Sequence, residues 1–331
     1  MTLPVVICDD SALARKQLAR SLPGGWDISI TFANNGKEAI DAIKQGKGDL
    51  LFLDLNMPVM DGYETLETIR QENLDSLVLV VSGDIQPEAK KRVMALGALD
   101  FINKPINSEL VTSILLNYGI ISKSQPQSST ELARFDDQQL DLTDLVQEVV
   151  NVAMGQAGKQ LGELLGTFVH LPIPKVHLLP YQQLPSLITP SQTLTYSGVS
   201  QGFIGSAIAG EAIVIISTQN LPVLAKLLPT SQQDLQASEL EILTDLSGLL
   251  AGACIKGISQ QLDVQFSLGH PILLGQQTDL PRLLGKNQQQ NVLAIDLNYQ
   301  MPDKNLQCDL LLVFTEDSLP ALTERMGCLN G

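Results

Sequence analysis

Residues 3–117 alternate five short apolar runs with stretches in which apolar residues recur at helical spacing. The runs are continuously apolar, which is the pattern of parallel strands buried on both faces. Alternation of strands with helices places helices on both faces of such a sheet. We therefore predict an α/β fold with a doubly wound, five-stranded parallel sheet. The expected strands are Val5–Cys8, Ile28–Phe32, Leu50–Leu53, Leu77–Val81 and Asp100–Ile102.

The chain has 331 residues, which suits two domains better than one core. Residues 122–129 are polar and contain a proline, which indicates a linker. Beyond them, two long helical patterns over 142–165 and 238–262 are mixed with hairpin-like strands. We expect domains at 1–120 and 139–331, joined by a linker over 121–138. The second domain is expected to be α+β.

The second domain contains an internal repeat, because each long helical pattern is followed by a proline and an apolar strand. Both helical patterns also carry glycines, which cost about 0.5–1 kcal/mol each in a helix interior relative to alanine. That cost suggests that the two helices approach each other closely, although simple tolerance is the alternative. The glycines concerned are Gly155, Gly158, Gly162, Gly248 and Gly252.

The formal net charge of −15 argues against binding to nucleic acid or to anionic membrane surfaces, since no extended basic patch interrupts it. No apolar run approaches the roughly 20 residues of a membrane span, and the first ten residues do not resemble a signal peptide. The four cysteines are scattered, so we expect reduced thiols and no zinc site. A cytoplasmic protein without membrane insertion is expected.

Polar residues follow four of the expected strands at the point where each strand ends. Asp9 and Asp10 follow the first strand, Asp54 the third, and Lys104 the fifth, while Ser82 closes the fourth. The carboxyl ends of parallel strands share one edge of a sheet, so these side chains should converge. Clustered carboxylates repel unless a hard cation such as Mg²⁺ is present, and one of them can then act as a nucleophile toward phosphorus.

These residues lie in four motifs that together resemble a response regulator receiver domain, whose fold is flavodoxin-like. The motifs are Val5-Val-Ile-Cys-Asp-Asp-Ser11, Leu53-Asp-Leu-Asn-Met-Pro-Val-Met-Asp-Gly62, Val81-Ser-Gly83 and Asp100-Phe-Ile-Asn-Lys-Pro105. The resemblance implies that Asp54 accepts phosphate from a histidine kinase. It implies Mg²⁺ held by Asp9, Asp10, Asp54 and the backbone carbonyl of Asn56. It makes Lys104 the phosphate-contacting lysine, Ser82 the switch hydroxyl and Phe101 the switch aromatic residue.

A second constellation lies on the first long helical pattern, where Asp144, Glu148 and Asn151 are spaced i, i+4 and i+7. At 3.6 residues per turn they form one polar stripe, beside an apolar stripe of Leu145, Val149 and Val152. Asn151 is followed 23 residues later by Pro174. This pattern resembles the phosphatase signature of the CheC/CheX/FliY family of chemotaxis proteins.

That resemblance implies an aspartyl-phosphate phosphatase in which Asn151 positions a water and Glu148 pairs with the lysine of a phosphorylated receiver. The target would be a CheY-like response regulator or the chain's own receiver. In the second half of the repeat, Glu241, Asp245 and Pro271 keep the pattern but Gly248 replaces the amide, so one active site is expected. The alternative is a non-enzymatic adaptor that binds chemotaxis partners when Asp54 is phosphorylated.

Overall fold

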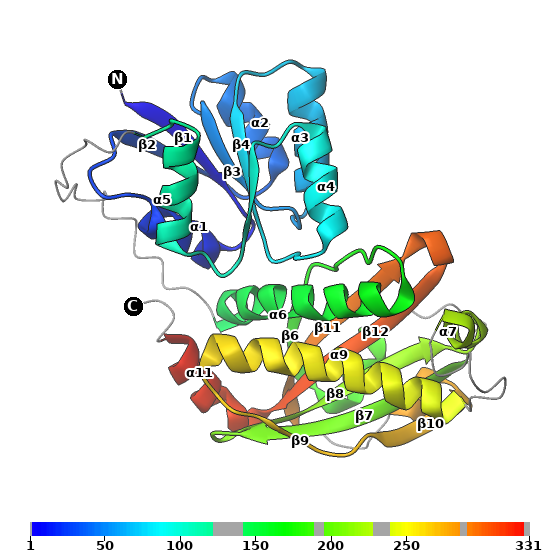
Figure 1. Ribbon diagram of the computed structural model, residues 1–331. Coiled ribbons are helices and arrows are strands. Elements are labelled where there is room, and N and C mark those ends of the chain that lie inside the picture. Colours follow the sequence, from blue (N-terminus) through cyan, green and yellow to red (C-terminus); the bar gives the residue numbers. More distant parts are fainter. Residues whose placement is uncertain (1, 122–141, 189–194, 228–238, 285–289, 328–331) are drawn as a thin grey trace. The chain divides into compact units, whose positions relative to one another are not determined.

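In a computed structural model of the chain, the described residues are 2–121, 142–188, 195–227, 239–284 and 290–327 (Figure 1). The chain forms two compact units, residues 1–148 and 149–331. The division falls within the continuous helix α6 (Leu142–Leu165), most of which belongs to the second unit. The predicted linker over 121–138 lies outside the described residues except for Ile121, so the predicted domain boundaries stay a prediction.

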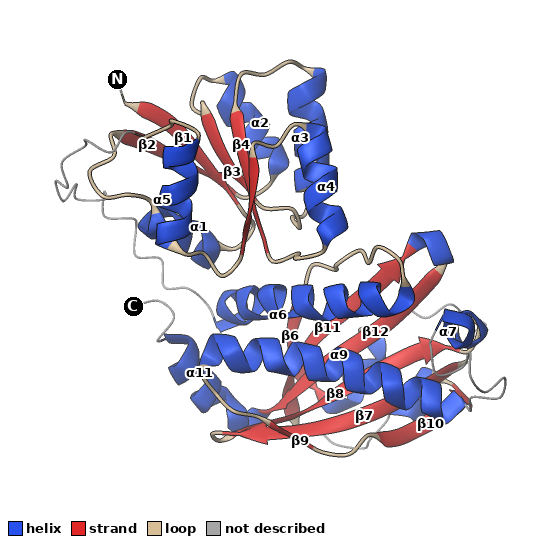
Figure 2. Cartoon of the chain, viewed as in Figure 1, coloured by secondary structure: helices blue, strands red, loops and turns tan. Residues whose placement is uncertain are grey.

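The first unit is the predicted doubly wound α/β fold. Its parallel sheet has the order β2-β1-β3-β4-β5. The strands are β1 (Leu3–Cys8), β2 (Ile28–Ala33), β3 (Leu50–Leu53), β4 (Leu77–Ser82) and β5 (Asp100–Asn103). The helices are α1 (Ala12–Ser21), α2 (Gly36–Lys44), α3 (Gly62–Gln71), α4 (Pro87–Leu96) and α5 (Ser108–Asn117), and Figure 2 shows them flanking the sheet.

Both faces of this sheet are buried, because alternate residues of each strand enter different cores. On β1, Val6 and Cys8 join one core, whereas Val5 and Ile7 join the other. Side chains also fix where the helices begin, since Asp61 caps α3 in a capping box with Glu64. The bond between Lys104 and Pro105 is cis.

The second unit is built on an antiparallel sheet, which has seven strands among the described residues. Its order is β10-β7-β8-β12-β11-β6, and β9 also pairs with β7. The strands are β6 (Lys175–Pro180), β7 (Tyr196–Gly205), β8 (Ile208–Ser217), β9 (Ser267–Leu268), β10 (Ile272–Thr278), β11 (Asn291–Met301) and β12 (Leu306–Thr315). This sheet confirms a separate antiparallel region beside helices.

The predicted repeat appears as two halves with the same order of elements. The first half runs α6, β6, the 3₁₀ helix η1 (Tyr181–Ser186), β7, β8 and α7 (Leu221–Leu227). The second runs α9 (Glu239–Leu262), β10, α10 (Leu280–Leu284), β11, β12 and α11 (Leu319–Gly327). Among the described residues it also contains three short elements without a counterpart in the first half, which are β9, η2 (Pro302–Lys304) within the hairpin and η3 (Glu316–Ser318). Equivalent elements begin 95 to 99 residues apart, as Tyr196 and Asn291, and Tyr181 and Leu280, do.

The two halves exchange their edge strands. β6 of the first half pairs with β11 of the second, and β10 of the second half pairs with β7 of the first. The central pair, β8 against β12, joins the two halves antiparallel. If each strand of the order β10-β7-β8-β12-β11-β6 is replaced by its equivalent in the other half, the same order results when read backwards. The topology of these six strands therefore has a two-fold pseudo-symmetry.

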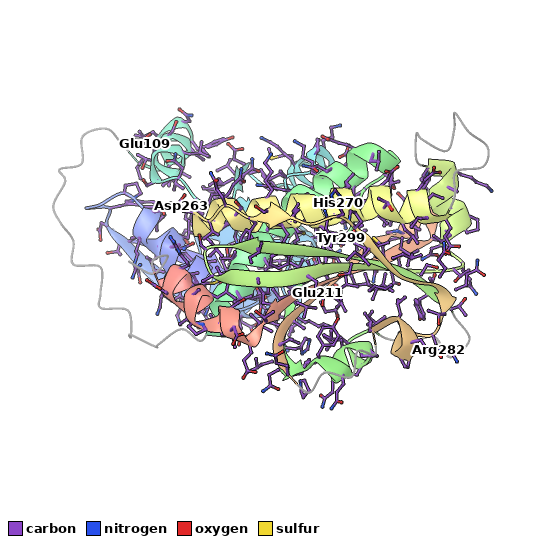
Figure 3. All side chains as sticks on the ribbon, turned by 90° about the horizontal axis from the view of Figure 1, so that it is seen from below. Glu109, Glu211, Asp263, His270, Arg282 and Tyr299 are labelled. Atoms are coloured by element: carbon purple, nitrogen blue, oxygen red, sulfur yellow. The ribbon has the colours of Figure 1, made fainter. Side chains whose placement is uncertain are left out.

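Helices α6 and α9 lie side by side on one face of this sheet (Figure 1). Gln156 of α6 donates a hydrogen bond to Gln260 of α9 at 3.1 Å. The buried side chain of Tyr299 on β11 contacts α9, with its hydroxyl 3.4 Å from the sulfur of Cys254 (Figure 3). α9 is long and apolar enough to cross a membrane by length and composition alone, but 61% of its apolar window is buried, as in a core helix.

The close approach of the helices is confirmed, but not through the glycines predicted for α9. A Cβ added to Gly257 would lie 2.6 Å from the α-carbon of Ala153, so this glycine lets the two helices touch. Gly248 and Gly252 instead face open space, and Gly158 packs on Leu171. The glycine pattern could not show which side of α9 faces α6, and the contact lies about one turn beyond Gly252.

The other face of the sheet carries an acidic residue in a partly polar setting. Asp309 of β12 is only 7% exposed and accepts a hydrogen bond from the side-chain amide of Asn298 on β11. Burial raises the pKa of Asp309 to about 6, and the charge of Asp296 adds to the shift, whereas the bond from Asn298 opposes it. The folded structure therefore disfavours the ionised form of Asp309.

We predict opposite effects from the same substitution at two positions of α9. Gly257→Ala should destabilise the second unit by roughly 1–3 kcal/mol, because the new methyl group overlaps Ala153. Gly252→Ala should stabilise it by about 0.5–1 kcal/mol, since its methyl group enters open space and alanine favours the helix. Urea denaturation followed by circular dichroism measures both. Stabilisation by both substitutions would contradict the close contact.

We predict that Asp309→Asn makes stability less dependent on pH. The folded pKa of about 6 lies above that of the unfolded chain, so the folded protein binds more protons between about pH 4 and pH 6. Stability should therefore fall as the pH rises through this window, and the loss should persist at higher pH. Asp309→Asn should recover about 1–3 kcal/mol at pH 7 and nearly nothing at pH 4. An equal effect at both pH values would show that ionisation is not the cause.

Candidate phosphoacceptor pocket and acid–amide helix

The carboxyl edge of the first sheet gathers the residues that the sequence predicted there. β1 and β3 are neighbours, and the amide of Asp54 donates to the carbonyl of Cys8 at 2.9 Å. The amide of Lys104 donates to the carbonyl of Ser82 at 2.9 Å, which joins the ends of β4 and β5. The turns after these four strands therefore lie at one edge.

Lys104 is the cation that lies against the carboxylates of Asp9 and Asp54 in this pocket. Its Nζ lies 2.8 Å from Oδ2 of Asp9 and 3.4 Å from Oδ1 of Asp54. Oδ1 of Asp54 accepts no hydrogen bond from the described residues. Burial raises the pKa of Asp54 to about 7, which Lys104 opposes and Asp9 strengthens. One lysine therefore does not fully compensate the two carboxylates, and a further cation would stabilise the ionised form of Asp54.

Short backbone contacts fix the direction of each carboxylate. Oδ2 of Asp54 accepts from the amide of Asn56 at 2.9 Å, and Oδ1 of Asp9 accepts from the amide of Ser11 at 2.9 Å. Both are Asx turns, in which a side chain bonds the backbone two residues ahead. A Cβ on Gly62 would collide with the carbonyl oxygen of Asp54, so the turn needs glycine there. These contacts were not predicted, although an Asp directly after a strand is the residue type that bonds the backbone two residues ahead.

The oxygen donors suit a hard cation. Asp9, Asp10, Asp54 and the carbonyl of Asn56 offer oxygen only, as Mg²⁺ prefers, with water completing its coordination. Among the residues that the structure describes, no three acidic, His or Cys side chains already surround one point as ligands. Two carboxylates, the carbonyl and several waters would suffice, because Mg²⁺ keeps much of its hydration.

The two predicted switch residues lie on adjacent strands. Ser82 is buried, and its Oγ accepts from the amide of Asp84 at 3.1 Å. Phe101 is buried in the core that also contains Val80 and Val93. Beside the pocket, burial and then the charges of Asp9 and Asp54 raise the pKa of the Cys8 thiol, so this cysteine stays protonated and structural.

The second predicted constellation lies on α6. Asp144, Glu148 and Asn151 fall within this one uninterrupted helix, so their spacing keeps them on a single stripe. The neighbouring apolar residues Val149 and Val152 are buried, as predicted. Pro174 directly precedes β6, just as Pro271 directly precedes β10.

The equivalent stripe on α9 lacks the amide. Glu241, Asp245 and Gly248 are all exposed on this helix, at the positions that the repeat equates with Asp144, Glu148 and Asn151. An acid is present at both acidic positions, whereas the position of the amide has no side chain. The arrangement therefore offers the acid–amide pair only on α6 among the described helices.

The response regulator receiver domain family matches residues 5–115. The protein-glutamate methylesterase/protein-glutamine glutaminase of Treponema pallidum (strain Nichols) is 36% identical over 110 residues, which are 32% of this chain and 27% of the relative. The protein of the same name from Clostridium acetobutylicum is 27% identical over 192 residues, or 54% of this chain and 55% of the relative. The matches thus span about a quarter to about a half of these relatives.

Two solved structures are similar to parts of the chain. The CheX–CheY–BeF3–Mg complex from Borrelia burgdorferi has a chain that is 27% identical, with a TM-score of 0.33, covering 36% of this chain and 90% of that chain. FliY of Thermotoga maritima is 16% identical, with a TM-score of 0.42, covering 57% of this chain and 96% of that chain. Together with the family match, the five-stranded sheet and its acidic edge make residues 5–115 a response regulator receiver domain of the two-component and chemotaxis kind.

Proposed function

We propose that this chain is a two-domain signalling protein in which a phosphorylatable receiver is coupled to an aspartyl-phosphate phosphatase. The receiver accepts phosphate on Asp54 from a histidine kinase. The second unit hydrolyses the aspartyl phosphate of a CheY-like response regulator or of the chain's own receiver. The proposed location is the cytoplasm. The observation that carries the phosphatase proposal is the Glu148–Asn151 pair on α6, at the head of a repeated half that retains Pro174 at the expected distance.

The receiver step follows from the pocket. An oxygen of Asp54 attacks the phosphorus of the donor, a new carboxyl oxygen–phosphorus bond forms, and the bond to the donor breaks. Lys104 is 3.4 Å from Asp54, close enough to pair with an oxygen of the incoming phosphoryl group. A bound Mg²⁺ would supply the second positive charge, with Asp9, Asp10, Asp54 and the carbonyl of Asn56 holding it.

The phosphatase step needs a water aligned with the phosphorus. A carboxamide can hold a water through hydrogen bonds without acting as a nucleophile itself, which is the role proposed for Asn151. Glu148, one turn earlier, would pair with the phosphate-contacting lysine of the target and so fix its position. Water then forms the new oxygen–phosphorus bond, and the target aspartate leaves as a carboxylate. This is catalysis by positioning.

We predict that Asp54→Asn abolishes phosphorylation by acetyl phosphate, since an amide is a far poorer nucleophile than a carboxylate. Phosphorylation of the unaltered chain should require Mg²⁺ and stop in excess chelator, because the pocket keeps uncompensated negative charge. Mass spectrometry of the intact chain measures the phosphate. Labelling of Asp54→Asn at another residue, or labelling without metal, would refute the assignment.

We predict that Asn151→Ala lowers the rate of phosphate release by about 10²–10³, the usual cost of losing one such catalytic hydrogen-bonding group. The full chain carrying Asp54→Asn is mixed with a separately phosphorylated CheY-like receiver, so that its own receiver contributes no phosphate. Gly248→Ala is the matched control on α9, and it should leave the rate nearly unchanged because its methyl group enters open space.

The same experiment separates the enzyme from the adaptor. If the chain is an adaptor, phosphate release stays at the spontaneous rate with and without Asn151. A second readout identifies the target, because loss of phosphate from Asp54 in the otherwise unaltered chain should slow in Asn151→Ala only if the chain acts on its own receiver. A large loss of rate in Gly248→Ala with an intact fold would contradict a single active site.

A further inference from the structure

The second unit contains a largely apolar cleft, formed mainly by β7, β8, β9 and β10, that the proposed chemistry does not use. Its volume is about 620 Å³, within the range of roughly 300–1,000 Å³ that is typical of small-molecule sites. Among the described residues that line it, only Glu211 is charged. Much of its wall is aliphatic, with Ile204, Leu268, Ile272 and Val313 among the lining residues.

Gly202 lies in the interior of β7 and lines this cleft. Its φ is not in the left-handed region, so the backbone conformation does not require glycine. A Cβ added to Gly202 would have one neighbour within 4 Å among the described residues, the carbonyl oxygen of Gly210 at 3.9 Å. The cleft therefore has room for a side chain here. A glycine in a strand interior weakens the strand, and it often marks a place where a ligand approaches the backbone closely.

The internal repeat shows that the fold tolerates a side chain at this position. Shifts of 96 and 98 residues carry the paired residues of β7 and β8 onto paired residues of β11 and β12. Gly202 and Glu211 then correspond to Asn298 and Asp309, and the side chain of Asn298 donates to Asp309. The second half thus keeps the acid but fills the equivalent space with an amide. The open space over Gly202 is a property of the first half's sequence.

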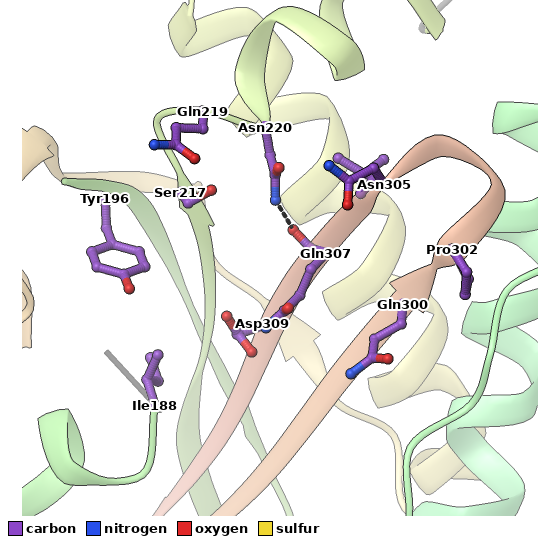
Figure 4. A pocket seen from close by; sticks show the side chains of 11 residues that line it. Ile188, Tyr196, Ser217, Gln219, Asn220, Gln300, Pro302, Asn305, Gln307 and Asp309 are labelled. Carbon is purple, nitrogen blue, oxygen red and sulfur yellow. Dashed lines mark hydrogen bonds between the residues drawn. The ribbon is translucent and has the colours of Figure 1, made fainter. Parts of the chain in front are cut away.

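The rim of the cleft differs between the halves in the same way. Ile204 corresponds to Gln300, which lines a polar depression of about 410 Å³ together with Asp309 (Figure 4). Polar side chains suit such exposed positions. In the first half, however, Ile204 is 62% exposed and Ile272 is 64% exposed, and both line the cleft. Exposed apolar side chains gathered at a cleft indicate that an apolar group binds there.

A buried hydroxyl at the polar end of the cleft can orient such a ligand. Ser200 lines the cleft, is more than nine-tenths buried, and donates its hydroxyl to Oε2 of Glu211 at 2.7 Å. Oε1 of Glu211 accepts from the hydroxyl of Tyr181 at 3.2 Å, which holds the carboxylate in place. Because Ser200 gives its side-chain hydrogen to Glu211, its oxygen can only accept from a further group. A ligand that meets Ser200 must therefore be a donor.

We propose that this cleft binds a small aromatic molecule that carries one hydrogen-bond donor, such as an indole or a phenol. A flat ring can lie against the bare backbone of Gly202, as aromatic rings do when they stabilise glycines in β-sheets. The ring would contact Ile204 and Ile272, and its donor would bond Oγ of Ser200. Ligands with several charges are disfavoured by the apolar wall. This inference is independent of the phosphatase proposal, because the cleft shares no residue with the α6 stripe.

The test is an NMR titration of the full chain with indole, observing the δ1-methyl signals of Ile204 and Ile272, which a bound ring should shift. We expect saturable shifts with half-saturation below about 5 mM. The analogue 1-methylindole, whose nitrogen carries no hydrogen, should bind about fivefold more weakly. Gly202→Val should remove the saturable shifts, because its side chain takes the place of the ring. This variant is expected to fold, since valine favours strands and the position has room.

A second variant tests the apolar rim without changing the glycine. Ile204→Asn should weaken indole binding by about fivefold or more, observed through the methyl signal of Ile272, because the ring loses an apolar contact. The matched control is Leu178→Asn on β6, which replaces a residue that is 65% exposed and lies outside the cleft. It should bind indole as the unaltered chain does. Urea denaturation of each variant checks that it is folded.

Three outcomes would overturn the proposal. The first is an absence of saturable shifts in the unaltered chain up to about 10 mM indole. The second is unchanged affinity in folded Gly202→Val and Ile204→Asn, because indole would then bind somewhere else. The third is equal affinity for indole and 1-methylindole, which would refute the donor and the role of Ser200.

Discussion

The second unit depends on the exchange of edge strands between its two halves. β6 completes its hydrogen bonding only on β11, and β10 only on β7. A half by itself would have its hairpin and its helix but would lack the strand that covers one edge of the hairpin. The two halves are therefore held to one common geometry even where their sequences have diverged. This constraint explains why α9 has the same length as α6 and stays buried, although glycine replaces the amide residue at position 248.

The first unit depends on a different constraint, which is the neighbouring position of β1 and β3 in a parallel sheet. That position brings Asp9 and Asp54 to the same lysine, although 45 residues separate them in sequence. Asx turns then hold the carboxylates in place through backbone amides. Hydrophobic cores pack against both faces of the sheet, so the polar residues at its carboxyl edge extend from rigidly held strands.

The sequence predicted the first unit almost completely, because its strands are continuous apolar runs and its helices begin at polar caps such as Ser11 and Asn107. It also predicted the long helices of the second unit and their mixture with hairpin-like strands. It did not identify the partners of the edge strands β6 and β10, since pairing over such distances depends on contacts that no local pattern encodes. The hydrogen bond between Asn298 and Asp309 was not predicted for a related reason, because the two residues become neighbours only through the register of β11 and β12.

The strand exchange also has a consequence for synthesis of the chain on the ribosome. Leu178 of β6 pairs with Leu293 of β11, so about 115 further residues must be made before this strand finds its partner. At about 5–20 residues per second, that interval is roughly 6–23 seconds. The receiver can fold during this time, but the nascent second unit waits with an unpaired strand whose Leu178 stays 65% exposed even in the finished fold. Chaperone binding during translation should therefore concentrate on the interval between the synthesis of β6 and that of β11.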